Sequence, residues 1–116
     1  MRVVNETRDS IIAERADLAT RAFDRMKGLL GRDRLEPGCG LVIEPCTSIH
    51  TFFMRFAIDV LFIDRNGEVI RTYESLPPWR ITRVHSKAKS VIELPTGMLS
   101  QTGTRPGDRI LFVHQS

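Results

Sequence analysis

Three side chains that could do chemistry recur at every second position in one segment of the chain. Cys46 supplies a thiol, Ser48 a hydroxyl and His50 an imidazole. Successive side chains of a β-strand point to opposite faces, so an extended segment would place all three on one face. A thiol beside an imidazole is a pairing used in nucleophilic catalysis, because the imidazole takes the proton from the thiol.

The distance along a strand argues against that catalytic pair. Cys46 and His50 would lie about 13 Å apart at a rise of ~3.3 Å per residue, so a contact requires a bend at Thr47 and Ser48. A metal is the second possibility, with Asp59 or His85 completing the ligand set. A Cys-x3-His spacing is weak evidence for a metal, and no second ligand pair in the sequence supports it. We therefore expect no catalytic residue, metal or cofactor, and a binding or accessory domain; the alternative is a Cys/His or metal-dependent hydrolase.

Asp59 is the most informative carboxylate because it lies in the most apolar run of the chain, Cys46 to Asp64. Burying an ionised carboxylate without a partner costs several kcal/mol. One interpretation is structural: Asp59 accepts backbone N–H groups or pairs with Arg25 or Arg32. The other makes it an anchor for a ligand. Glu93 repeats the pattern in a second apolar run, but nothing in the sequence sets its distance from Asp59.

These residues predict a partly polar recess that binds an unidentified small molecule or a partner protein. Concave apolar sites with a few polar groups are the usual form of a ligand site. Part of the recess is expected in the long connection 74–89, because long loops are often functional. The predicted ligand-binding residues are Cys46, Ser48, His50, Thr51, Arg55, Asp59 and Trp79. The core or the wall of the recess is expected to hold Phe52, Phe53, Phe56, Phe62 and Trp79.

The composition is that of one ordinary globular domain, residues 1–116, with 41% apolar and 27% charged residues. The sequence has no apolar run of the ~18 residues that a membrane helix needs, and no apolar N-terminal signal segment, so we expect a cytoplasmic protein. The net charge is +3 and the two signs are interspersed, so we expect no nucleic-acid partner. In the cytoplasm, Cys39 and Cys46 should be reduced. The oligomeric state is left open.

Short apolar segments separated by turns predict an α+β domain that is mainly β. Strands are expected at 3–5, 10–16, 41–44, 46–64 (as one or two strands), 69–73, 90–94 and 109–113. Asp64–Gly67 is a hairpin signal. Apolar residues at helical spacing predict a helix from Thr20 to Gly31, and a short helical turn is expected at 95–99. Such strands avoid exposed edges by forming a small closed or nearly closed antiparallel barrel or sandwich.

Four motifs follow one another along most of the chain. They are Arg25–Arg32, Gly40–Ile43, His50–Asp64, and Glu93–Pro95 with Gly97, followed by Gly107-Asp108. In this order they resemble the domain of unknown function 192 family, an uncharacterised conserved family of bacteria and archaea. The resemblance implies a small β-rich domain without an established activity. Many members have a tryptophan-methionine pair where His50-Thr51 stands and a proline where Ala57 stands; this chain is similar to the subgroup with a Cys-x-Ser-Ile-His-Thr segment.

Overall fold

The computed structural model describes residues 1–20, 29 and 31–114. Two short sheets and a short helix, α2 (Met98–Thr102), make up its regular structure. The strands are β1 (Arg2–Asn5), β2 (Ser10–Ala13), β3 (Arg15–Ala19), β4 (Cys39–Ile43), β5 (Ile58–Asp64), β6 (Val69–Leu76), β7 (Ala88–Pro95) and β8 (Ile110–Val113). No helix in this part of the chain is long and apolar enough to cross a membrane.

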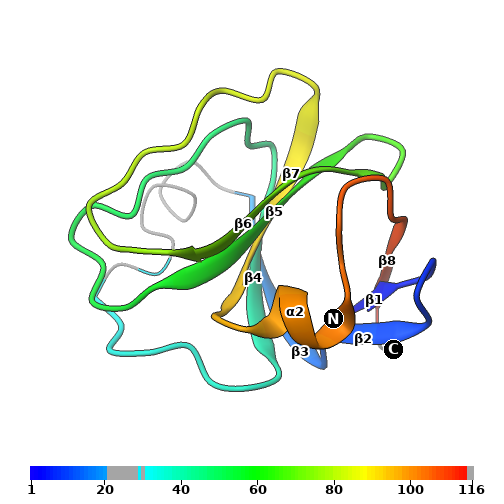
Figure 1. Cartoon of the computed structure of the whole chain (residues 1–116), viewed down its shortest axis with the longest axis horizontal. Coiled ribbons are helices and arrows are strands. Elements are labelled where there is room, and N and C mark those ends of the chain that lie inside the picture. The colour runs from blue at the N-terminus through cyan, green and yellow to red at the C-terminus, as the bar shows by residue number, and fades with distance from the viewer. Residues whose placement is uncertain (21–28, 30, 115–116) are drawn as a thin grey trace.

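The three-stranded sheet has the order β2-β1-β8 and is antiparallel. The five-stranded sheet has the order β3-β4-β7-β5-β6, in which only β3 and β4 run parallel. The two sheets lie beside each other without closing into a barrel (Figure 1). The smaller sheet contains both the first and the last described strand, β1 and β8. The prediction of a mainly β, sandwich-like α+β domain is confirmed.

The core consists of two apolar clusters on the two faces of the larger sheet. β5 lies between β7 and β6, and its alternation sends Leu61 and Ile63 to one face and Val60 and Phe62 to the other. The first cluster includes Leu99 of α2 and side chains of the smaller sheet. The second cluster is covered by loop residues such as Ile49 and Met54. A strand covered on both faces is apolar throughout, which explains the continuous burial of β5 from Ile58 to Ile63.

The hairpin at Asp64–Gly67 and the helical turn near residue 98 are confirmed, the latter as α2. The strand expected before residue 58 is wrong: residues 44–57 are irregular apart from one isolated bridge between His50 and Ile81. The expected strand 10–16 is two strands, β2 and β3, which belong to different sheets. The helix expected from Thr20 to Gly31 lies largely outside the described residues.

Candidate functional site

Two long loops, residues 44–57 and 77–87, are joined along their length. We call this pair the loop ribbon. The His85 amide donates to the Thr47 carbonyl at 2.8 Å, and the Thr82 amide donates to the Ile49 carbonyl at 2.9 Å. The Thr51 amide donates to a carbonyl of the facing loop at 2.8 Å. The ribbon projects from the larger sheet on the side away from the smaller sheet, at the left of Figure 1.

Thr51 fixes the outer end of the loop ribbon. Its side chain is fully buried, and its hydroxyl donates to the Pro77 carbonyl at 2.6 Å and accepts from the Arg80 amide at 2.9 Å. Its carbonyl accepts the amides of Trp79 at 3.0 Å and Met54 at 3.2 Å. One threonine therefore supplies the hydrogen bonds that a regular ladder would otherwise give to this turn.

Four rings form a continuous row on this end of the ribbon, which we call the aromatic ledge: His50, Phe52, Trp79 and Phe53. His50 stacks on Phe52 with ring centroids 5.1 Å apart, and Phe52 lies 6.1 Å from Trp79. Trp79 in turn lies 4.7 Å from Phe53. Phe53 is 70% exposed and Trp79 is 57% exposed. The contacts fix the rings against one another while their outer surfaces face solvent.

The backbone at the two most exposed rings is strained. Phe53 and Trp79 both have φ of 66°, in the left-handed region that bulky side chains rarely adopt. Such a conformation costs roughly 1–3 kcal/mol per residue and persists only where the surroundings hold it, often at functional sites. Here the Thr51 carbonyl holds the Trp79 amide and, one residue beyond Phe53, the Met54 amide. This backbone conformation lowers the stability of the ribbon and turns two aromatic side chains toward solvent.

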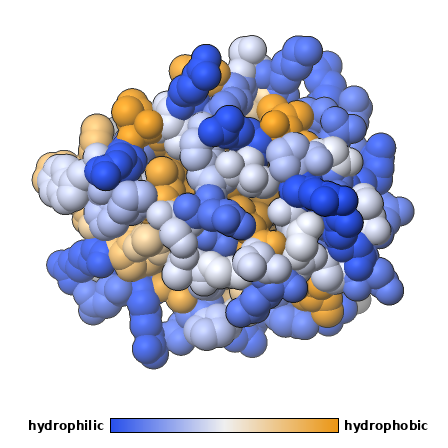
Figure 2. All heavy atoms as spheres, in the orientation of Figure 1, coloured by the Kyte–Doolittle hydropathy of each residue, from blue (hydrophilic) through white to orange (hydrophobic). Residues whose placement is uncertain are grey.

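The surface around the ledge is apolar and basic. Ile81 and Val84 are also largely exposed, and Figure 2 shows apolar side chains at the surface on the left, over the loop ribbon. Arg80 and Arg83 are exposed, whereas Arg55 is paired with Asp33. Over the loop ribbon, residues 44–57 and 77–87, the basic side chains are Arg55, Arg80, Arg83 and Lys87, against one acidic side chain, Glu44.

His85 anchors the base of the ribbon to the larger sheet. Its Nε2 is 2.8 Å from the Tyr73 hydroxyl, and its ring lies 4.5 Å from the ring of Phe62. Burial lowers the pKa of His85, and the nearby guanidinium groups of Arg71 and Arg83 lower it further. Near neutral pH this histidine is therefore a neutral hydrogen-bonding group, which is the form that a packed imidazole requires.

The thiol and imidazole of the predicted recess have other partners. The Cys46 thiol donates to the Ser48 carbonyl at 3.1 Å, and Nδ1 of His50 accepts the Phe52 amide at 3.2 Å. Within the described ranges, no three His, Cys, Asp or Glu side chains lie close enough together to hold a metal ion. These contacts give no support to the hydrolase alternative.

Asp59 has the structural role that burial of a carboxylate suggests. Its two oxygens accept the amides of Ser75 at 2.8 Å, Gly97 at 3.0 Å and Leu99 at 2.9 Å. Leu99 belongs to the first apolar cluster, whereas Ile49 of the loop ribbon belongs to the second. The sheet therefore separates Asp59 from the ribbon, and the carboxylate fixes the start of α2.

Of the predicted site residues, the structure brings His50, Thr51 and Trp79 together at the ledge. Cys46 and Ser48 precede them in the ribbon, and Arg55 follows. The ligand-binding role of these residues stays a prediction. Phe62 lies in the core, as expected, because it is fully buried. Phe53 and Trp79 are exposed and are not core residues, and their place in the wall of a ligand recess stays a prediction. Apolar periodicity could not have predicted the exposure of Phe53 and Trp79, because the positive φ at each residue breaks the alternation of a strand.

Comparison with known proteins gives the family. The DUF192 family, described as an uncharacterized ACR, matches residues 3–112. A UPF0127 protein of Pyrococcus horikoshii is 33% identical over 114 residues, covering 93% of this chain and 96% of that protein. A UPF0127 protein of Thermococcus sibiricus is 30% identical over 112 residues, covering 93% of this chain and 72% of that protein.

A solved structure has the same fold. The crystal structure of a protein of unknown function from Novosphingobium aromaticivorans superposes with a TM-score of 0.82 at 19% identity, covering 96% of this chain and 82% of that one. This likeness concerns the fold alone. The family match spans nearly all the described strands, from β1 to β8, and agrees with the resemblance of the four sequence motifs. The chain therefore belongs to the DUF192 family, for which no activity is established.

Proposed function

We propose that this domain is a binding module that holds a partner protein on the aromatic ledge. The observation that supports this most is that Phe53 and Trp79 are exposed and yet fixed at positive φ. Large aromatic side chains supply much of the binding energy of protein interfaces. A ring that is already immobilised loses little further entropy when a partner covers it, so the rigidity of the free ledge improves affinity.

The chemistry around the ledge defines the partner. Arg80 and Arg83 are exposed beside the apolar surface, while the acidic group Asp33 is engaged by Arg55. A basic rim attracts an acidic partner and orients it during encounter. Rings exposed by more than half suit an extended polypeptide better than a small molecule, which needs a concave site that covers most of its surface. The partner segment should therefore combine acidic residues with apolar side chains.

Selection from a displayed library of random peptides tests this proposal. We expect the protein to enrich peptides that carry acidic and aromatic or aliphatic residues. The enriched peptides should not bind the double variant Phe53→Ser/Trp79→Ser. The matched control is Ile11→Ser/Val113→Ser, which removes two exposed apolar side chains from the smaller sheet and should bind as the wild type does.

The proposal fails under three outcomes. The first is a library that yields no enriched peptides. The second is enrichment of basic peptides, which would contradict the charge argument. The third is unchanged binding by the ledge variant. Thermal unfolding of both double variants verifies that they are folded, and since all four side chains point to solvent we expect unfolding temperatures close to that of the wild type.

A further inference from the structure

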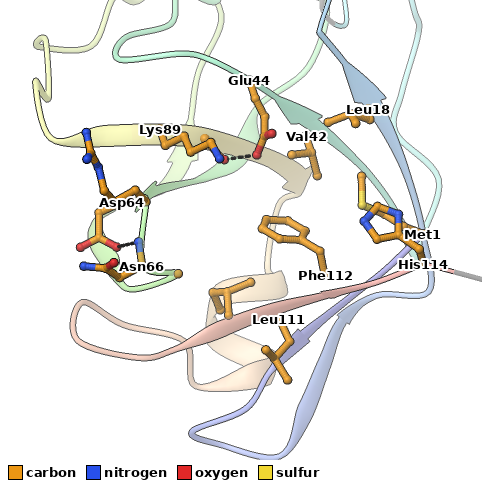
Figure 3. A pocket seen from close by; sticks show the side chains of 14 residues that line it. Met1, Leu18, Val42, Glu44, Asp64, Asn66, Lys89, Leu111, Phe112 and His114 are labelled. Atoms are coloured by element: carbon orange, nitrogen blue, oxygen red, sulfur yellow. Dashed lines mark hydrogen bonds between the residues drawn. The ribbon is translucent and has the colours of Figure 1, made fainter.

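A concave site, separate from the aromatic ledge, lies between the two sheets. A cavity of about 380 Å³ is lined by strands of both. Its apolar part includes Leu18 of β3, Val42 of β4 and Phe112 of β8. Figure 3 shows these three side chains in the space between the sheets, with Asp64 and Asn66 at one end. The volume lies within the ~300–1,000 Å³ typical of small-molecule sites.

The end of this cavity at the β5–β6 turn adjoins a second cavity of about 810 Å³. The two share the lining residues Asp64, Arg65, Asn66 and Lys89. The second cavity adds Lys87 and has no large apolar side chain in its lining. The two cavities, which together we call the hollow, thus differ in their lining. The cavity between the sheets has apolar side chains beside polar ones such as Glu44, whereas the second cavity is polar and bears lysines.

The carboxylates that line this hollow accept hydrogen bonds from groups of the protein itself. Glu44 accepts a hydrogen bond from the Ser90 hydroxyl. Oδ1 of Asp64 accepts the amides of Asn66 and Glu68, each at 2.9 Å, and so holds the β5–β6 turn.

The basic side chains that line the hollow, in contrast, are not engaged by its carboxylates. Arg65, Lys87 and Lys89 are exposed, and none of them makes an ion pair in the part of the chain that the structure describes. The second cavity is lined by these three cations and by one carboxylate, Asp64, whereas Glu44 lines only the cavity between the sheets. The polar end of the hollow therefore carries an excess of positive charge.

We propose that this hollow binds a small amphipathic anion, an alkyl carboxylate of medium chain length. The alkyl chain lies between the sheets over Val42 and Phe112, where its burial removes apolar surface from water. The carboxylate lies at the polar end, within reach of Arg65, Lys87 and Lys89. This site does not include the aromatic ledge. A test of ligand binding here therefore does not decide whether the ledge binds a partner protein.

Calorimetry with sodium octanoate, decanoate and dodecanoate, kept below their micelle concentrations, measures this site. We expect saturable binding that tightens by about fourfold per added methylene, the equivalent of ~0.8 kcal/mol, until the cavity is filled. Amide shifts in ¹⁵N NMR spectra should be largest at Gly67, Ile110 and Phe112, which line the cavity. The ledge variant Phe53→Ser/Trp79→Ser should bind decanoate as the wild type does.

Two kinds of variant then test the polar end and the apolar side chains of the site separately. The triple variant Arg65→Gln/Lys87→Gln/Lys89→Gln should weaken decanoate roughly fivefold or more, as expected for partly exposed charge pairs, and leave decanol unchanged. The matched control Arg15→Gln/Arg71→Gln/Arg105→Gln removes three exposed cations that do not line the hollow. Leu18→Trp, on the half-exposed rim of the cavity, should narrow it and weaken both ligands.

Three results would overturn the proposal. One is the absence of saturable binding by any of the three carboxylates. Another is tighter binding of decyltrimethylammonium than of decanoate, which would mean that Glu44 and Asp64 set the charge preference. The last is decanoate binding that neither the triple variant nor Leu18→Trp alters, which would place the ligand elsewhere on the protein.

Discussion

Replacing Glu93 with glutamine should remove a pH-dependent loss of stability. Glu93 lies in β7 on the face of the second apolar cluster and is 3% exposed, and its Oε1 has no hydrogen-bond partner among the described residues. Burial raises the pKa of this carboxyl from 4.5 to about 7, although the charge of Arg32 acts in the opposite direction. At neutral pH the folded protein therefore holds a carboxyl poised between its two protonation states.

The magnitude follows from the two pKa values. Between about pH 4.5 and 7 the folded protein retains a proton that the unfolded chain has released, so stability falls as pH rises through this window and levels off above it. At about 1.4 kcal/mol per pH unit, the total loss is roughly 3 kcal/mol. Glu93→Gln cannot ionise, so its stability relative to the wild type should increase by that amount from pH 4.5 to pH 8.

Urea unfolding of the wild type and Glu93→Gln across this pH range provides the measurement. Comparing the two proteins at each pH cancels the titration of the other groups. Glu74→Gln serves as the matched control, because it removes an exposed carboxylate from β6 and should show no such trend. A stability difference between Glu93→Gln and wild type that is constant from pH 4.5 to pH 8 would refute the reasoning.

Three further changes probe the other buried polar groups, each by urea unfolding. Asp59→Asn leaves one acceptor oxygen for three amide donors and should cost about 2–4 kcal/mol; unchanged stability would show that these hydrogen bonds do not hold α2. Burial raises the pKa of Asp108, but hydrogen bonds from Arg8, Asn5 and the Arg105 amide outweigh it and leave the pKa below its usual value of 3.8. Asp108→Asn should therefore destabilise the protein at pH 7, and the difference from wild type should shrink as pH falls below 3.8; a difference that persists at pH 2 would contradict this. Thr51→Val leaves the Pro77 carbonyl and the Arg80 amide without their hydroxyl partner and should cost about 1–3 kcal/mol, with faster hydrogen exchange at Arg80; equal exchange rates would mean that the hydroxyl does not fix the ribbon.

The sequence predicts the elements whose causes are local. Asp64–Gly67 is recognisable as a turn because Gly67 supplies the positive φ and the Asp64 side chain accepts amides two and four residues on. β5 is recognisable because an apolar run of this length, ended by a turn, is typical of a buried strand. Both depend on residues that are close in the chain, so a single sequence contains the required information.

The loop ribbon could not be predicted in this way. The partners of Thr51 lie 26 to 29 residues away in a loop that has no periodic pattern, so local alternation predicted a strand that does not form. The sequence indicated that Asp59 would accept hydrogen bonds, because a buried carboxylate needs donors. The identity of two of those donors, the amides of Gly97 and Leu99, depends on how α2 packs against the sheet. Which face Glu93 takes likewise depends on the register of β7 against β5.

The most direct test of the account is the affinity of one library-selected acidic peptide for the ledge variant. Calorimetry would compare the wild type, Phe53→Ser/Trp79→Ser and the control Ile11→Ser/Val113→Ser. Loss of two central aromatic anchors should weaken binding by about 30-fold or more, equivalent to ~2 kcal/mol, while the control stays within about twofold of the wild type. Equal affinities for the wild type and the ledge variant would contradict the claim that the aromatic ledge is the binding surface of this domain.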